Sequence, residues 1–495
     1  MRKSLNQSCL REIFVWLKKD AITLYQCCLV QNDWLQAGAR ELYSNPYQYF
    51  TPLFEQTQQL RALLLFQTFL ESTLKTKENL SSENTKEPLL DYLCLLRSVD
   101  LTWFKRLLLI YCPEENQRVL HQDVIRRVFQ VYMKYPISVR HLVHTQTFQL
   151  EELFQNPLAL SSLSRLEICW RFLETQTANE FLQLVSLNCQ QLTSLNINFN
   201  RSISFELQGV KEILKKQTHG TLKTFRLRKI QLRPKHLDEI MDGLLSGPKD
   251  TLLTLGLEQC TLFPGSSLEK VGKLPNLRTL EFGFCYGLCD SHLTHLAESC
   301  SNLRNLNLSH TSITITSVRV IIERLGSRLK RLDVSYPYRV DHSLDSCIPL
   351  LSQNAKNLVQ FKMKGIRYGY PAIEELIESC ANLRSLSLGT PYRQEANLAD
   401  RLLTRIICKC SQLRELDLGN TKITTNGLNA LSKTNLKLGE ILCVGLNSIT
   451  ANQMYPELNI ESNPFWEEEE EEEEDEHSEQ AFLLPSNFFT KSGSF

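Results

Sequence analysis

The stretch LRTLEFGFCYGLCDSHLTHLAESCSNL, residues 277–303, contains one complete copy of the pattern that decides the fold. Its first six residues read Leu-x-x-Leu-x-Phe, an alternation typical of a short strand with one buried face. After a turn, apolar residues recur from Leu293 to Cys300 at the spacing i, i+3, i+7, which favours one face of a helix. The stretch therefore predicts a short strand whose chain returns through a helix to Leu303, where the pattern starts again.

The same unit recurs along most of the chain. The pattern Leu-x-x-Leu-x-Leu, with other apolar residues at some places, returns eleven times from about residue 160 at steps of 25 to 30 residues. This period resembles that of leucine-rich repeats, whose single units bury their apolar faces only by stacking. We therefore expect an α/β solenoid shaped like a horseshoe, with a parallel sheet on its concave face and helices on its convex face. The units begin at Leu163, Leu192, Leu222, Leu252, Leu277, Leu303, Leu329, Leu358, Leu383, Leu413 and Leu438, and two weaker copies begin at Leu96 and Val139.

Composition on either side of the repeats sets the expected domain boundaries. Residues 5–45 carry apolar residues at helical spacing and predict a small three-helix domain. Residues 46–95 predict a helical linker with a polar, exposed loop at 75–88. The repeats then occupy residues 96–450, and they are clear from residue 160. The segment 451–495, which contains a dense acidic run, predicts a disordered tail.

Charge is unevenly distributed along the chain. The 55 Lys and Arg residues balance 55 Asp and Glu residues, but ten of the acids form one run at 467–476, and 55 against the remaining 45 leaves a body of about +10. The acidic run is most simply a solvated tail; alternatively it folds back on the basic body or attracts a basic partner. The apolar segment 481–489 that follows is either a docking motif or a strand that covers the last repeat.

The sequence also indicates where the protein resides. No apolar stretch reaches the roughly 18 to 20 residues that span a bilayer, and charged residues interrupt the N-terminal segment 1–20. We expect neither membrane insertion nor secretion, and a location in the cytoplasm, the nucleus or both. In such a reducing compartment the 16 cysteines are expected to be thiols.

The N-terminal motif residues resemble those of an F-box. The order of apolar landmarks, an Ile-Phe pair at 13–14, a Leu-Val pair at 29–30, Trp34 and a closing Leu-Tyr at 42–43, matches that family, although Asn6 stands where the family usually has proline. The resemblance implies docking to the adaptor Skp1. The residues that it assigns to this contact are Leu5, Leu10, Ile13, Phe14, Leu17, Leu29, Val30 and Trp34.

Cysteines at fixed places in the repeats strengthen this resemblance. Cys260 and Cys285 follow a predicted strand. The cysteines that precede the next leading leucine by three residues are Cys189, Cys300, Cys380 and Cys410. This is similar to the cysteine-containing subclass of leucine-rich repeats found in F-box proteins. The combination implies a substrate-recognition subunit of an SCF-type ubiquitin ligase, whose F-box binds Skp1 and, through it, cullin, while the repeats hold a target protein. The alternatives are an N-terminal helical cap for the solenoid and a non-enzymatic interaction scaffold with a vestigial F-box.

Neither catalysis nor a resident metal is expected. Cys285, Cys289, His292 and His295 have ligand chemistry for zinc, but their two pairs are unusually close and small cysteines suit the crowded turns of the repeat. No nucleophile elbow and no phosphate-binding loop occurs in the sequence. We expect an adaptor without a catalytic site or cofactor, acting through proximity while a partner enzyme supplies the chemistry.

The predicted concave face supplies candidates for target binding. Basic residues beside the inward leucines alternate with acids, which disfavours a nucleic-acid stripe. Large aromatic residues follow several strands at equivalent places and commonly anchor protein partners, or else they close the ridge by packing on neighbouring loops. If the acidic tail folds back, the same cations are its expected contacts. The candidates are Trp170, Phe199, Arg226, Arg228, Phe284, Tyr336, Lys362 and Lys364.

Overall fold

The structure is a computed structural model of the chain, and it describes most of residues 157–429 together with parts of both flanks. The described residues are 10, 13–14, 27, 34, 37–39, 98–100, 141–144, 157–170, 175–204, 208–217, 220–231, 234–260, 265–338, 343–391, 396–424, 426–427, 429, 440–444 and 460–462. The predicted linker at 46–95, its loop and the acidic run lie outside them. No helix in the described ranges combines the length and apolar character needed to cross a bilayer.

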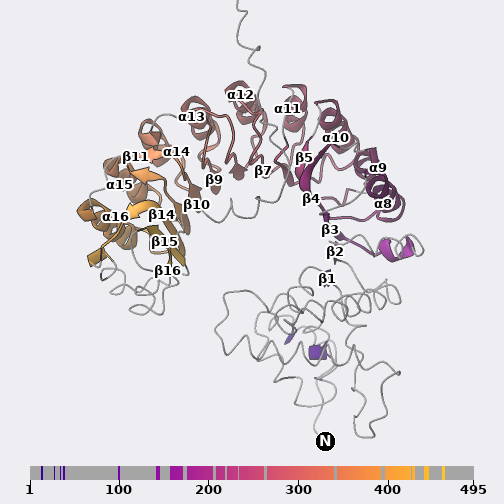
Figure 1. Ribbon diagram of the computed structural model, residues 1–495, viewed down its shortest axis with the longest axis horizontal. Coiled ribbons are helices and arrows are strands. Elements are labelled where there is room, and N and C mark those ends of the chain that lie inside the picture. Colours follow the sequence, from indigo (N-terminus) through magenta and orange to yellow (C-terminus); the bar gives the residue numbers. More distant parts are fainter. Residues whose placement is uncertain are drawn as a thin grey trace, which may run out of the picture.

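The repeats form one parallel sheet of fourteen strands, which confirms the predicted solenoid. Figure 1 shows the strands along the inner side of an arch and the helices along its outer side. Strands follow one another in chain order, because each unit adds one strand beside the last. The strands of this sheet are β1 (Ser98–Asp100), β2 (His141–His144), β3 (Arg165–Trp170), β4 (Ser194–Ser204), β5 (Thr224–Gln231), β6 (Thr254–Glu258), β7 (Thr279–Glu281), β8 (Asn305–Asn307), β9 (Arg331–Asp333), β10 (Gln360–Lys362), β12 (Ser385–Ser387), β14 (Glu415–Lys422), β15 (Glu440–Val444) and β16 (Ile460–Ser462).

Helices return the chain from one strand to the next on the convex side (Figure 1). A small second sheet pairs β11 (Arg367–Tyr368) with β13 (Thr390–Pro391). The helices are η6 (Pro157–Leu160), α8 (Thr175–Asn188), α9 (Gln208–Lys216), α10 (Pro234–Ser246), α11 (Gly265–Gly272), α12 (Asp290–Ser299), α13 (Ile315–Leu325), η7 (Leu344–Ser346), α14 (Ile348–Asn354), α15 (Tyr370–Ser379) and α16 (Ala396–Lys409).

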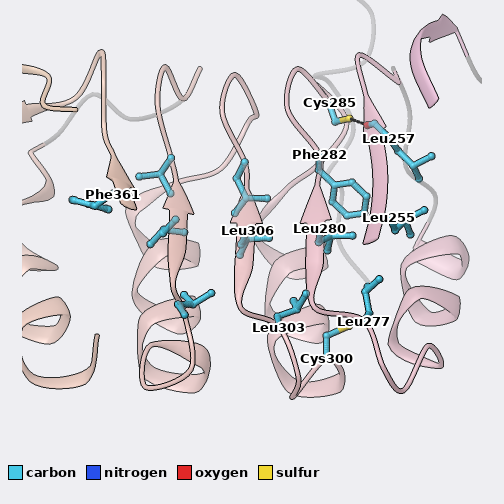
Figure 2. Close-up of a cluster of buried hydrophobic side chains, with 14 of the residues drawn as sticks. Leu255, Leu257, Leu277, Leu280, Phe282, Cys285, Cys300, Leu303, Leu306 and Phe361 are labelled. Carbon is cyan, nitrogen blue, oxygen red and sulfur yellow. Dashed lines mark hydrogen bonds between the residues drawn. The ribbon is translucent and has the colours of Figure 1, made fainter. Parts of the chain in front are cut away.

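The core lies between the sheet and the helices and consists of apolar ladders that run through the repeats. Leu280 pairs with Leu255 on one side and with Leu306 on the other, and all three are buried. Figure 2 shows these side chains between the strands and the helices, together with Phe282 and Leu257. Burial of each such side chain stabilises the fold by about 1.5 to 3 kcal/mol, but only while its neighbouring repeats are in place.

Buried thiols link consecutive repeats. The Cys285 thiol donates a hydrogen bond to the backbone oxygen of Leu257, one repeat earlier, at 2.8 Å (Figure 2). Cys189 donates to the oxygen of Leu160 at 3.2 Å in the same way. Only a protonated thiol can donate, and burial keeps these thiols protonated because it disfavours the thiolate. Burial raises the pKa to about 12 for Cys189, Cys285 and Cys300, and to about 11 for Cys347, Cys380 and Cys410.

Aspartates on the convex side make a second link between repeats. Asp290, at the start of α12, accepts hydrogen bonds from the backbone nitrogen and the hydroxyl of Thr314, at 2.9 and 2.6 Å. Thr314 is the residue that caps α13, so one repeat holds the beginning of the next repeat's helix. Asp400 likewise accepts hydrogen bonds from the backbone nitrogen and the hydroxyl of Thr424, at 2.9 and 2.5 Å. Neutral donors and a charged acceptor make these bonds stronger than ordinary ones.

The sheet includes both earlier copies of the repeat and extends beyond the predicted repeats only at its C-terminal end. The weak copies that begin at Leu96 and Val139 supply β1 and β2. At the other end, β16 pairs with β15 within the segment 451–495, which was predicted to be disordered throughout. In the backbone register of the two strands, Ile460 pairs with Ile441. The prediction failed at this strand because a single apolar position carries no detectable period.

The buried thiols predict a loss of stability at alkaline pH. A thiol in the unfolded chain ionises near pH 8.5, whereas in the folded chain Cys285 ionises near pH 12. Its contribution is therefore complete below about pH 8.5 and is lost as pH rises toward 12. We expect Cys285→Ala to lower the free energy of unfolding by roughly 1 to 2 kcal/mol at pH 7.5, and this difference to shrink by roughly 1 to 2 kcal/mol by pH 10.

Urea unfolding of both proteins at pH 7.5, 9 and 10 measures this difference. Cys408, which is exposed, provides the control, because Cys408→Ala should track the native chain at every pH. A difference between the native chain and Cys285→Ala that stays constant with pH would contradict the assignment.

Candidate functional site

The concave face of the sheet carries side chains that flank the buried ladder residues. Arg226 of β5 reaches across β6 to Glu281 of β7, with Nε to Oε2 at 2.5 Å and Nη2 to Oε1 at 2.8 Å. Gly256 stands between the two, in register with both. A Cβ built on Gly256 would lie 2.9 Å from Arg226 Cγ and 2.9 Å from Glu281 Oε2. The glycine thus provides the space in which this two-pronged pair forms.

Other predicted target-binding cations also have partners on this face. Arg228 Nε lies 2.7 Å from Glu258 Oε2, and Lys364 Nζ contacts Asp417 Oδ2. The hydrogen bond that Arg226 donates to the Glu281 carboxylate raises the pKa of Arg226. Burial lowers the pKa of Lys364, but its hydrogen bond and attraction to Asp417 outweigh burial, so the net pKa is raised. These cations are therefore fixed within the sheet, whereas Lys362 makes no ion pair with the described part of the chain.

Aromatic rings form a ladder where three neighbouring strands end. The Phe284 ring stacks on the His310 ring with centroids 4.0 Å apart and planes 8° apart, and His310 stacks on Tyr336 at 4.7 Å and 26°. All three residues adopt left-handed backbone conformations, with φ of 59°, 52° and 51°. Such conformations cost non-glycine residues about 1 to 3 kcal/mol each. The turn therefore holds these rings in place, half-buried and side by side.

A second, more exposed row of aromatics lies beside this ladder. Tyr286 and Tyr338 are 49% and 52% exposed, and their ring centroids are 5.0 Å apart. Tyr338 also approaches His310, at 6.3 Å between centroids. We call Tyr286, Phe284, His310, Tyr336 and Tyr338 the aromatic patch. Its exposed tyrosines have the large, rigid surface and polar tip that are common at protein interfaces.

The predicted aromatics do not all belong to this patch. Phe199 is 1% exposed and packs in the core, so it offers no surface to a target. The reason is the length of its strand: β4 continues to Ser204, so the alternation that buries Leu195 and Ile197 also buries Phe199. Strand β7 ends at Glu281, and the turn directs Phe284 outward. Trp170 pairs with Phe199 in the sheet, but its side chain lies outside the described residues.

His310 is a member of the patch that the search for aromatics missed. It stands 26 residues after Phe284 and 26 residues before Tyr336, at the same place in its repeat. The signal that finds it is the repeat register, together with the flat ring that histidine shares with phenylalanine and tyrosine.

A polar hollow lies on the concave face over β3, β4 and β5. It has a volume of about 370 Å³ and is lined by Arg165, Glu167, Asn196, Lys223 and Arg226, among others. Asn196 Oδ1 is buried there and has no hydrogen-bond partner in the described structure. The hollow therefore has cations and an unused acceptor with which to hold a polar side chain of a partner.

The residues that resemble an F-box are only partly described. Leu10 and Phe14 are fully buried, and Phe14 packs edge-on against Trp34 with centroids 5.7 Å apart. They form internal packing rather than exposed contact surface. Ile13 is 42% exposed and is the described F-box position that presents most apolar surface. Leu5, Leu17, Leu29 and Val30 lie outside the described residues.

Three of the four residues considered for zinc, Cys285, Cys289 and His292, make contacts that are structural. Cys285 is buried and bonded to Leu257, as described above, while Cys289 precedes α12 with its sulfur 3.3 Å from His292 Nδ1. Burial lowers the pKa of His292. Within the described ranges, no three Cys, His, Asp or Glu side chains come together as a metal site.

Comparison with solved structures gives likenesses, and the one described here is of low similarity. No protein-family profile matches the sequence. Among solved structures, the chain resembles one in the crystal structure of the Rad7 and Elc1 complex in yeast, at 18% identity and a TM-score of 0.47, covering 67% of this chain and 77% of that chain. The parallel sheet, whose strands follow the leucine-rich repeats in chain order, by itself defines the class of protein as a leucine-rich-repeat solenoid.

The charge bridge across Gly256 predicts a change of sign between two backgrounds. In the native chain, Gly256→Ala should lower the free energy of unfolding by about 1 to 3 kcal/mol, because the new methyl group collides with Arg226 and Glu281. In an Arg226→Ala/Glu281→Ala background, the same change should be neutral or stabilising by up to about 1 kcal/mol, since alanine suits a strand better than glycine. Urea denaturation of the four proteins measures both effects, and destabilisation of equal size in the two backgrounds would contradict the geometry.

Proposed function

We propose that this protein is a substrate-recognition subunit of an SCF-type ubiquitin ligase. In this proposal the N-terminal F-box binds Skp1, and through it cullin, while the solenoid holds the target protein. The observation that carries the target-binding half is the aromatic patch, because turns of unfavourable backbone conformation hold three of its rings side by side and its two outer tyrosines are about half exposed. The adaptor half rests on the order of the motif residues between Leu5 and Tyr43 and on the exposed apolar side chain of Ile13.

The proposed role needs no catalytic group in this chain. Buried thiols such as Cys285 have a raised pKa and stay protonated at neutral pH, so they are poor nucleophiles. A target held on the concave face would be modified by an enzyme that the complex brings near, and proximity alone supplies the rate. We propose an adaptor without cofactor or metal that acts in the cytoplasm, the nucleus or both.

A non-enzymatic scaffold is the second candidate. The full burial of Leu10 and Phe14 favours it, since buried residues can serve to cap the solenoid without any adaptor. The two candidates differ in one observable, which is whether Skp1 binds the N-terminal helices.

Binding to Skp1 in the full chain tests the proposal. We expect Ile13→Asp, and separately Leu29→Ala with Val30→Ala, to weaken co-precipitation of Skp1 and cullin at least tenfold, because each removes apolar contact area from the F-box. Leu187→Asp is the matched control: Leu187 is an exposed apolar residue of α8, 62% exposed, and lies far from the motif in sequence. Undiminished recovery of Skp1 with both F-box variants would leave the scaffold as the better candidate.

Loss of the outer aromatics tests target recognition separately. We expect Tyr286→Ser with Tyr338→Ser to keep Skp1 while losing other proteins that co-purify with the full chain, as identified by quantitative mass spectrometry. Tyr286→Phe with Tyr338→Phe keeps both rings and should recover most of them. An unchanged set of co-purified proteins in the serine variant would exclude the aromatic patch as the target site.

A further inference from the structure

A row of exposed cations lies where the chain enters the sheet in successive repeats. The residue after each leading leucine forms a backbone ladder: Arg304 N donates to Arg278 O at 2.8 Å, and Lys330 N donates to Arg304 O at 2.7 Å. The ladder continues through Val359 and two further arginines with N to O distances of 2.7 to 2.8 Å. We call its five cations the basic row; they are Arg278, Arg304, Lys330, Arg384 and Arg414.

The basic row differs from the cations within the strands. All five side chains are exposed, and none makes an ion pair with the described residues. The turns that lead into these strands, at 275–278, 301–304, 327–330, 356–359, 381–384 and 411–414, contain no Asp or Glu. Inside the strands, acids alternate with bases and form no basic stripe. One position earlier, the stripe is present.

Within this chain, the acidic run at 467–476 is the complement of the basic row. Five strand spacings of about 4.8 Å separate Arg278 from Arg414, or about 24 Å. The ten acids span up to about 33 Å when extended. One acidic run therefore has both the length and the charge to lie along the whole basic row.

The chain can also bring the acidic run to the row. Ser462 ends β16, which is two strands beyond β14, and it stands about four residues further along the sheet than Arg414. These offsets are about 10 Å across the sheet and about 13 Å along it. The five residues from Ser462 to Glu467 span up to about 17 Å, which is enough to place Glu467 beside Arg414.

We propose that the basic row is a binding site for an acidic polypeptide segment and that the chain's own residues 467–476 occupy it. The contact is between extended, opposite charges, so salt weakens it and an acidic partner can displace it. This site is separate from Arg226, Arg228 and Lys364, whose charges are already matched within the sheet. The inference does not depend on the proposed ligase function.

Competition in the full chain tests the proposal. The probe is a fluorescein-labelled peptide of sequence EEEEEEEEDE, and its binding is followed by anisotropy at 50 and 300 mM NaCl. We expect the native chain to bind it at least tenfold more weakly than a full-length variant whose ten acids at 467–476 are replaced by the matching amides. That gain should vanish when the basic row is also changed to glutamine, and it should fall at 300 mM salt.

A matched control removes five cations elsewhere. Glutamine replaces Lys215, Lys235, Arg319, Arg324 and Arg401, which are also exposed but lie on helices of the convex side. This control, in the amide background, should bind the peptide within about twofold of its parent. Equal binding by the native and amide chains, or equal loss with the control set, would overturn the proposal. The proposal would also be overturned if a labelled single-stranded oligonucleotide bound to the basic row equally tightly in the native chain and in the amide chain.

Cross-linking of the native chain gives an answer that needs no variant. A carbodiimide activates a carboxylate, and the Lys330 amine then displaces the activating group as a urea to leave an amide bond. We expect the main intramolecular cross-link of Lys330 to join it to residues 467–476. We also expect this cross-link to be lost at 300 mM NaCl. A Lys330 peptide joined only to other acids of the chain would contradict the assigned occupant.

Discussion

Stacking of one repeat on the next is the constraint on which the rest of this structure depends. A three-residue strand such as β7 has no stability alone, and its Leu280 is buried only because Leu255 and Leu306 lie on either side. Cys285 reaches back one repeat to Leu257, and Asp290 reaches forward to Thr314. Each unit is thus linked to both neighbours by apolar contact on the inside and by hydrogen bonds beyond the C-terminal end of the strand.

The same constraint determines what the surface can present. Because strands lie about 4.8 Å apart, any side chain type that recurs at one place in the repeat becomes a row with that spacing. At the end of the strand the row consists of flat rings, and Phe284, His310 and Tyr336 stack because ring thickness is close to the spacing of the repeats. At the start of the strand the row consists of cations, which repel one another at that distance. Neighbouring rings in such a row therefore stabilise one another by stacking, whereas a row of like charges is stabilised only by an oppositely charged partner.

The sequence predicts the architecture well and the chemistry of individual side chains poorly. Leading leucines identify the repeats, and each apolar triplet becomes a strand, because the period follows directly from burial. The period does not determine the direction in which each side chain points beyond the end of a strand. Phe199 and Phe284 occupy corresponding positions, but one strand continues and the other ends, so only the second ring faces outward. The Arg226 to Glu281 pair spans 55 residues and two strand spacings, and no local pattern reveals it without the register. His310 and the basic row become visible only when repeats are compared position by position.

Register also explains why the net charge of zero is uninformative. Inside the strands, acids and bases lie on neighbouring repeats and neutralise one another across the sheet, as at Arg228 and Glu258. One residue earlier, the same sheet carries cations without acids, and their compensating charges lie in a separate run more than fifty residues beyond Arg414. Ion pairs within the rigid sheet contribute to the stability of the fold. Ion pairs between the basic row and an acidic run that is joined to the sheet by a connecting segment can instead be replaced by ion pairs with another molecule. A target or partner would therefore interact with the charges of the basic row, so its binding should respond to salt and to competing acidic chains.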